Sequence, residues 1–268
     1  MLAVNGDHLH IRKVVSPNSL RACRTFLKQD PITNILVLGD LYQPLFSVSD
    51  IYCAMEKHRA VGVCSIYRAF STPSIVFGAS EPEVKRALLE TALKKVSDKF
   101  VSLCTPTDIN LLTQYSTLLH LHHEQQMTAN FPKQVKHEDV EVTKVQKNEL
   151  EELNSFYTQH NAEAWTPIQF ETGPYYCVKQ EGEIVSAAGV HIVTPQIAQL
   201  GNIITDEAYR NKGFATQCTY SLATDLASKG RIISLFVRAD NAPAIRMYEK
   251  LGFSKKRDIS FLIMQKKT

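Results

Sequence analysis

The stretch that decides the fold is Ala198-Gln-Leu-Gly-Asn-Ile-Ile-Thr-Asp-Glu-Ala-Tyr-Arg-Asn-Lys-Gly-Phe-Ala215. It begins as an apolar strand, passes through a polar turn and enters a helical pattern at Phe214. The first N–H groups of a helix have no partner within the helix, and the helix dipole places partial positive charge there. An anion binds such amides where the backbone is accessible. The stretch therefore predicts an anion site between a strand and a helix.

The hexapeptide Arg210-Asn-Lys-Gly-Phe-Ala215 fits the R/Q-x-x-G-x-G/A pattern of a pyrophosphate-binding loop. Gly213 has no Cβ to hinder a phosphate, and Ala215 keeps the next position small. Arg210 and Lys212 add positive charge. An ordinary loop before a helix fits the same six residues, so this motif alone leaves both interpretations open.

A second motif, Asn241-Ala-Pro-Ala-Ile-Arg-Met-Tyr-Glu-Lys-Leu-Gly-Phe253, follows after an apolar strand pattern at Ile232–Val237. In this order and spacing, the two motifs resemble the acetyl-CoA signature of the GNAT superfamily of N-acetyltransferases. The resemblance covers roughly Val140 to Met264. It implies an α/β (α+β) fold in which a mixed, mostly antiparallel sheet is flanked by helices.

The resemblance also implies a reaction, in which an amine attacks the thioester of acetyl-CoA directly and no metal takes part. The main chain of Ile203–Thr205 would pair with the pantetheine arm, and the amide of Ile203 would polarise the thioester carbonyl. Tyr248 would be the general acid. The coenzyme-binding residues implied in this way are Ile203, Ile204, Thr205, Arg210, Asn211, Lys212, Gly213, Phe214, Ala215, Thr216, Asn241, Ala244 and Tyr248.

Two of these residues also have purely structural interpretations. Tyr248 shares a helix face with Ile245 and Leu251, so it fits a core position. As an acid it would give its proton to a thiolate, because a thiol pKa of about 8.5 lies only modestly below a phenol pKa of about 10. Asn is a preferred N-cap, so Asn241 fits a capping role as well as contact with the coenzyme.

The general base is not identified by the sequence. Gln199 and Asn202 occupy the strand before the loop, and neither side chain accepts a proton usefully. A water relay is the favoured solution. The ionisable candidates are Glu163, Glu171, His191 and Glu207.

The acceptor is expected to be an amine, either a small molecule or a peptide. Trp165, Phe170 and Tyr175 are candidates for its pocket, although a packed loop explains them equally well. The alternative to an enzyme is an acyl-CoA-binding sensor or regulatory module without chemistry. The presence of Tyr248 argues against that alternative.

The second half of the chain is expected to fold in an order that the first half repeats. For the second half we expect strands at 140–145, 175–179, 184–193, 199–205, 232–237 and 259–264, with helices at 148–157, 214–229 and 241–251. For the first half we expect strands at 9–14, 51–56, 60–67, 74–77, 100–103 and 122–128, with helices at 18–27, 82–96 and 109–119. Two tandem GNAT-like domains follow from this repetition.

The first half lacks the phosphate loop. Only Gly78-Ala-Ser-Glu81 separates its strand from its helix, and Glu81 would repel a phosphate at that helix start. We therefore expect residues 1–135 to be a degenerate domain without coenzyme binding and residues 136–268 to be the acetyl-CoA-binding catalytic domain. The segment 131–137 is interpreted as the linker.

Composition excludes several other classes. Residues 1–135 carry 14 Lys and Arg against 11 Asp and Glu, and residues 136–268 carry 16 against 16, so neither half has the basic surface that nucleic-acid binding needs. The six cysteines lack C-x-x-C spacing and fit small buried hydrophobic positions, and His120, His122 and His123 fit a surface strand end better than a metal site. Without an apolar run of about 20 residues or a signal peptide, we expect no membrane partner and a cytoplasmic location.

Overall fold

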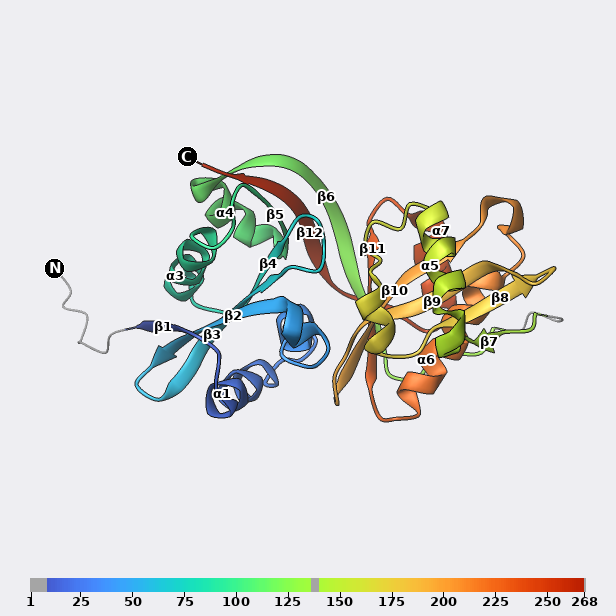
Figure 1. Cartoon of the computed structure of the whole chain (residues 1–268), viewed down its shortest axis with the longest axis horizontal. Coiled ribbons are helices and arrows are strands. Elements are labelled where there is room, and N and C mark those ends of the chain that lie inside the picture. Colours follow the sequence, from blue (N-terminus) through green and yellow to red (C-terminus); the bar gives the residue numbers. More distant parts are fainter. Residues whose placement is uncertain (1–8, 136–139, 268) are drawn as a thin grey trace. The chain divides into compact units, whose positions relative to one another are not determined.

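The computed structural model of the chain describes residues 9–135 and 140–267. The chain forms two compact units: one contains the residues up to His122 and those from Ser260 onward, and the other contains His123–Ile259 (Figure 1). Two long strands, β6 (Ser116–Ala129) and β12 (Ser254–Lys266), run through both units. Each unit is described by itself below.

The first unit is a sheet in the strand order β1-β2-β3-β4-β5-β12. Neighbouring strands are antiparallel except for the parallel pair β4–β5. Its strands are β1 (His10–Lys13), β2 (Ser49–Glu56), β3 (Arg59–Tyr67), β4 (Ser74–Ala79) and β5 (Lys99–Cys104). Its helices are α1 (Pro17–Leu27), α2 (Ile35–Gly39), α3 (Pro82–Leu93) and α4 (Ile109–Tyr115), with short 3₁₀ helices η1 (Leu45–Val48) and η2 (Pro106–Asp108).

Strand alternation gives the first unit two cores. Ala54 and Ile66 pack with α3 in one hydrophobic cluster, whereas Cys53 and Val63 pack with α1 in another. Because successive strand residues point to opposite faces, α1 and α3 cover opposite sides of the sheet.

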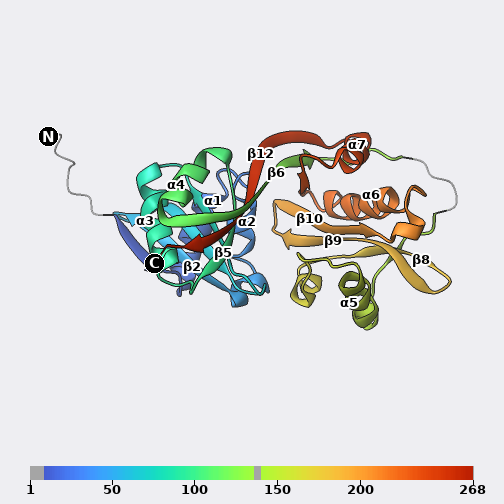
Figure 2. The same cartoon turned by 90° about the horizontal axis from the view of Figure 1, so that it is seen from above.

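The second unit repeats this plan in the order β6-β11-β10-β9-β8-β7, with β10 and β11 parallel. Figure 2 shows α5 and α6 on opposite faces of its sheet. Its remaining strands are β7 (Thr143–Lys144), β8 (Tyr176–Gln180), β9 (Glu183–Val193), β10 (Ile197–Thr205) and β11 (Ile232–Arg238). Its helices are α5 (Leu150–Gln159), α6 (Phe214–Ala227) and α7 (Ala242–Lys250), with 3₁₀ helices η3 (Lys147–Glu149), η4 (Pro167–Glu171) and η5 (Glu207–Tyr209).

Most expected elements are confirmed, although several of their bounds differ. The helix expected at 109–119 ends at Tyr115, and β6 begins at Ser116. The strand expected at 140–145 is only the pair Thr143–Lys144, and α2 was not predicted at all. The expected linker at 131–137 extends beyond the described residues at 136 and 137. Its described part packs within the second unit, where Lys133 N donates to Leu251 O at 2.8 Å.

Each half of the chain contributes its last strand to the other half's unit. Residues Glu124–Ala129 of β6 pair with β11, and residues Ser260–Gln265 of β12 pair with β5. The compact units therefore differ from a simple division at residue 135. The assignment of coenzyme binding to 136–268, and its absence from 1–135, stays a prediction.

The first unit contains a buried carboxyl group. Asp40, at the C-terminal cap of α2, is 6% exposed and accepts a hydrogen bond from Ser65 Oγ at 2.5 Å. Burial raises the pKa of Asp40 to about 7, and the Ser65 hydrogen bond opposes that rise. The folded state therefore holds this proton more tightly than the unfolded state.

We expect Asp40→Asn to change how stability depends on pH. In the wild type, stability is lost as pH rises from the unfolded pKa of 3.8 through about 7, because the buried carboxyl must ionise. The neutral amide keeps the Ser65 contact without that cost. We compare the free energy of unfolding of the variant with that of the wild type at each pH. The difference, variant minus wild type, should be larger at pH 8 than at pH 5 by up to about 3 kcal/mol.

Urea unfolding at the two pH values measures this difference. Glu81→Gln, which alters an exposed carboxylate of the same unit, is the control and should show an equal offset at both. An equal offset for Asp40→Asn would mean that the carboxyl is not held protonated by burial.

Candidate functional site

Strands β10 and β11 separate partway along their length. Their parallel register runs from Ile197 opposite Ile232 to Leu200 opposite Leu235 and stops there. Strand β10 continues to Thr205, and β11 continues to Arg238 while still paired with β6. The main chain of residues 201–205 on the β11 side therefore has no strand partner among the described residues. Extended backbone of this kind can accept another extended chain as a sheet neighbour.

The separation begins at a β-bulge centred on Asn202. Its backbone has a φ of 53°, and the register of β10 with β9 shifts between Gly201 and Ile204. Asn tolerates this left-handed conformation better than most residues. The bulge turns the peptide that follows it, which carries the amide of Ile203.

Three buried side chains hold this bulge. Tyr157 Oη of α5 donates to Asn202 O at 2.7 Å, and Asn202 Nδ2 donates to Gln169 Oε1 of η4 at 2.9 Å. Tyr175 Oη lies 3.4 Å from the same Nδ2. Sequence reasoning missed Tyr157 and Gln169, and it treated Asn202 only as a poor base. The Gly-Asn pair inside an apolar strand was the available signal for a bulge.

Helix α6 begins at the end of the turn that follows β10. Gly213 is its N-cap at a φ of 80°, Asn211 has a φ of 64°, and no side chain caps the helix. The first turn of α6 also contains no acidic residue. Its first amides carry partial positive charge, and a left-handed turn precedes them, which is a combination that binds anions in proteins.

The two predicted cations of this loop lie on the surface. Arg210 Nη1 is 3.0 Å from Glu207 Oε1, with 58% of the arginine side chain exposed. Lys212 Nζ lies 4.8 Å from the centre of the Tyr209 ring. Exposed contacts of this kind contribute about 0–1 kcal/mol, so both side chains are free to turn toward an anion.

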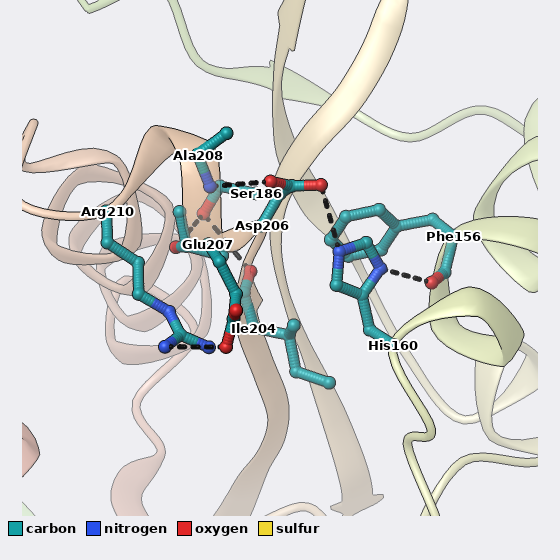
Figure 3. A network of polar contacts seen from close by, with 9 residues as sticks. Phe156, His160, Ser186, Ile204, Asp206, Glu207, Ala208 and Arg210 are labelled. Atoms are coloured by element: carbon teal, nitrogen blue, oxygen red, sulfur yellow. Dashed lines mark hydrogen bonds and ion pairs between the residues drawn. The ribbon is translucent and has the colours of Figure 1, made fainter.

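A polar network anchors the start of this turn (Figure 3). Asp206 N donates to Val185 O of β9 at 2.9 Å, and Asp206 Oδ1 accepts from Ala208 N at 2.8 Å. The Ala208 N–H and the neighbouring His160 hold the pKa of Asp206 below its usual value. His160 Nε2, from the end of α5, lies 3.2 Å from Asp206 Oδ2.

The second motif forms helix α7 as expected. Asn241 caps it, because its Oδ1 accepts from Ala244 N at 3.2 Å. Tyr248 is 6% exposed and packs edge-to-face on Phe253, with ring centres 5.9 Å apart. Burial raises the pKa of the Tyr248 phenol above its usual value of 10. Proton transfer from Tyr248 to a thiolate is therefore further uphill than the sequence argument assumed.

The four ionisable base candidates lie in different surroundings. Glu163, Glu171 and Glu207 are exposed. The ring of His191 lies over Gly201, where an added Cβ would be 2.2 Å from His191 Nε2. That nitrogen is buried and has no hydrogen-bond partner among the described residues. Burial lowers the pKa of His191, and Asn202 opposes that change.

The aromatic side chains expected at the acceptor pocket form a packed cluster. Trp165 is 9% exposed and Tyr175 is fully buried, and their rings meet edge-to-face at 5.4 Å. Tyr175 lies on Gly189, where a Cβ would be 1.8 Å from its ring. Tyr175 therefore supports the sheet, and it also lines a surface hollow together with Phe170. The assignment of these aromatic side chains to an acceptor pocket stays a prediction.

Other expectations from composition can be compared with the structure. All six cysteines are free and buried, as expected. His120 and His122 lie together on β6, with ring nitrogens 3.3 Å apart. Within 9–135 and 140–267, no three His, Cys, Asp or Glu side chains gather as metal ligands, and no helix has the length and apolarity to cross a membrane.

Comparisons with known proteins agree with this architecture. Residues 179–262, which include β10, the loop and α7, match the model of the FR47-like protein family. No curated protein matches the chain. A protein from Drosophila is similar over 98% of this chain and 99% of its own, with 12% identity and a TM-score of 0.72.

Two further solved structures that are similar to this chain are N-acetyltransferase-like by name. A tandem GNAT protein from the clavulanic acid biosynthesis pathway is 12% identical, covering 96% of this chain and 98% of its own, with a TM-score of 0.63. A GCN5-related N-acetyltransferase from Sphaerobacter thermophilus is 13% identical, covering 96% and 95%, with a TM-score of 0.60. This chain therefore has the GNAT acetyltransferase fold, present twice in tandem.

Proposed function

We propose that the protein is an acetyl-CoA-dependent N-acetyltransferase that binds one acetyl-CoA per chain, in its second unit. One observation carries the proposal. The uncapped start of α6 follows a strand whose free main chain diverges from its neighbour. The uncapped helix start can bind a pyrophosphate, and the unpaired strand main chain can pair with an extended arm that contains amides.

The pyrophosphate would bind the amides of 211–216. Gly213 allows close approach there, because a φ of 80° suits glycine and no Cβ is present. Arg210 and Lys212 would leave their weak surface contacts to add charge. The pantetheine arm would pair with Ile203–Thr205, and Asn241 and Ala244 would contact the coenzyme from the start of α7.

The reacting carbonyl would be polarised by the amide of Ile203, which the Asn202 bulge orients. The amine nitrogen attacks the carbonyl carbon, and its proton leaves through a water relay. The carbon–sulfur bond then breaks, and Tyr248 gives the thiolate its proton. Of the ionisable base candidates, His191 is the one whose ring lies against β10, with its Nε2 buried.

The first unit differs at the equivalent helix start. Helix α3 begins with Pro82, which has no N–H, and Glu83 adds negative charge in its first turn. Both changes oppose a phosphate at that position. The absence of coenzyme binding there follows from the same physics that favours binding at α6.

The general experiment is thiol release from acetyl-CoA in the presence of amines. A panel of polyamines, amino acids and peptides should contain at least one amine that accelerates release above hydrolysis. Coenzyme binding without release for any amine would favour the alternative of an acyl-CoA sensor. Absence of coenzyme binding would contradict both functions.

Gly213→Glu should nearly abolish acetyl-CoA binding while the protein stays folded. The new side chain blocks the approach to the amides, and its charge opposes phosphate at a helix N-terminus. We expect the dissociation constant from calorimetry to rise by at least about 100-fold, the scale of a lost charged contact.

Gly230→Glu is a matched control, because Gly230 has a φ of 76° and open space around it just beyond the other end of α6. This variant has the same backbone strain and the same added charge, but at a position outside the loop. If Gly213→Glu and Gly230→Glu bind acetyl-CoA with equal affinity, the loop is not part of the coenzyme site.

Tyr248→Phe should lower turnover by about 100-fold or more, since only the donated proton is removed. Coenzyme affinity should change little, because the ring still packs on Phe253. Steady-state kinetics and calorimetry measure the two quantities separately. Tyr115→Phe, which removes an exposed hydroxyl bonded to Glu90 in the first unit, is the control. Wild-type turnover in Tyr248→Phe would restore the core-aromatic interpretation.

A further inference from the structure

His160 lies between two hydrogen-bond acceptors. Its Nδ1 is 2.8 Å from the main-chain oxygen of Phe156, and its Nε2 is 3.2 Å from Asp206 Oδ2 (Figure 3). A main-chain carbonyl only accepts, and an ionised carboxylate only accepts. A neutral imidazole has one N–H and satisfies one of them, whereas an imidazolium satisfies both. The arrangement is complete only with His160 doubly protonated.

The groups around His160 come from α5 and from the turn that follows β10. The residue is the C-cap of α5, where a helix dipole attracts positive charge. Its ring packs on Phe156 at 4.5 Å, so that neighbour is uncharged. Across from it, Asp206 is the acid in contact, and Arg210 is the other cation acting on Asp206. Glu207, the next acid in the turn, is 81% exposed and paired with Arg210.

The same helix end holds both ends of one short stretch of β10. Tyr157 Oη contacts Asn202 O at the bulge, and His160 contacts Asp206 directly after Thr205. Between these two fixed points lie Ile203–Thr205, and Asp206 also caps η5 at the entry to the loop. Loss of the His160 contact would leave the side chain of Asp206 without its tie to α5, while the main chain of Asp206 stays bonded to Val185 O of β9.

We propose that His160 is a positioning residue for coenzyme binding: as an imidazolium it ties the end of α5 to Asp206 and so fixes the turn that leads into the Arg210–Ala215 loop. This inference rests on the proposed function of that loop. It makes coenzyme affinity fall when His160 loses its second proton, because only the imidazolium donates to both acceptors.

The experiment compares wild type, His160→Gln and Asp206→Asn by calorimetry with coenzyme A at pH 5.5 and pH 8. His160→Gln has one amide donor group and no charge, so it should bind about threefold to tenfold more weakly than wild type at pH 5.5 and nearly equally at pH 8. Asp206→Asn can offer an N–H to a neutral ring and still cap Ala208. It should therefore lose the pH dependence while keeping most of the affinity.

His58→Gln, at an exposed histidine in the β2–β3 turn, is the control and should match wild type at both pH values. At each pH, the dissociation constant of a variant is divided by that of the wild type. This ratio removes the effect of titrating the coenzyme's own phosphates, which is the same for both proteins. A His160→Gln ratio that is the same at both pH values, with wild-type behaviour in Asp206→Asn, would overturn the inference. It would leave the proposed function standing, since wild type still binds.

A measurement without coenzyme separates the two proposals. Amide hydrogen exchange at pH 6 should be faster across 206–213 in His160→Gln than in wild type, with exchange at 197–200 unchanged. This readout does not depend on coenzyme binding, so it tests the tie even if the loop binds something else. Unchanged exchange across 206–213 would overturn the positioning role.

Discussion

The backbone of β10 at Asn202 is the constraint on which the second unit depends. A residue at a φ of 53° within a strand costs free energy unless its surroundings hold it. Here the hydroxyl of Tyr157 and the carboxamide of Gln169 hold it from the α5 side. The pairing with β11 stops at Leu200, just before the bulge, and the main chain of Ile203–Thr205 has no strand partner on that side among residues 9–135 and 140–267. The acyl-transfer site that we propose needs both the oriented amide and the free strand edge, and this one bulge supplies both.

The two halves of the chain show how little is needed to keep or lose such a site. Both have a strand leading into a helix beside a parallel strand. In the second half the helix starts at Gly213 without cap or acid, whereas in the first half it starts at Pro82 with Glu83 in its first turn. The order of strands and helices is the same in both halves. The helix start in the first half, however, has an acidic residue and lacks one N–H group. The fold and the coenzyme binding that we propose are therefore set by different residues.

Periodicity and the two motifs predicted the strands, the main helices and the tandem fold, because long amphipathic segments carry a strong signal. Short-range patterns misled at Leu118 and Leu119, which keep helical spacing although β6 has already begun at Ser116. The five-residue helix α2 is too short for periodicity to detect. The contacts of Tyr157 and His160 were not predictable, since they join residues 45 and 46 positions apart in the chain. The strand exchange between the halves depends on pairing that a single sequence does not encode locally.

The most direct test of the central claim is amide hydrogen exchange of the intact protein with and without acetyl-CoA. We expect the coenzyme to protect the amides of 201–217, with the strongest change at the start of α6. We expect no change across 74–93, where β4 leads into α3. Protection at 74–93, or an unchanged 201–217 segment in the presence of bound coenzyme, would contradict the account.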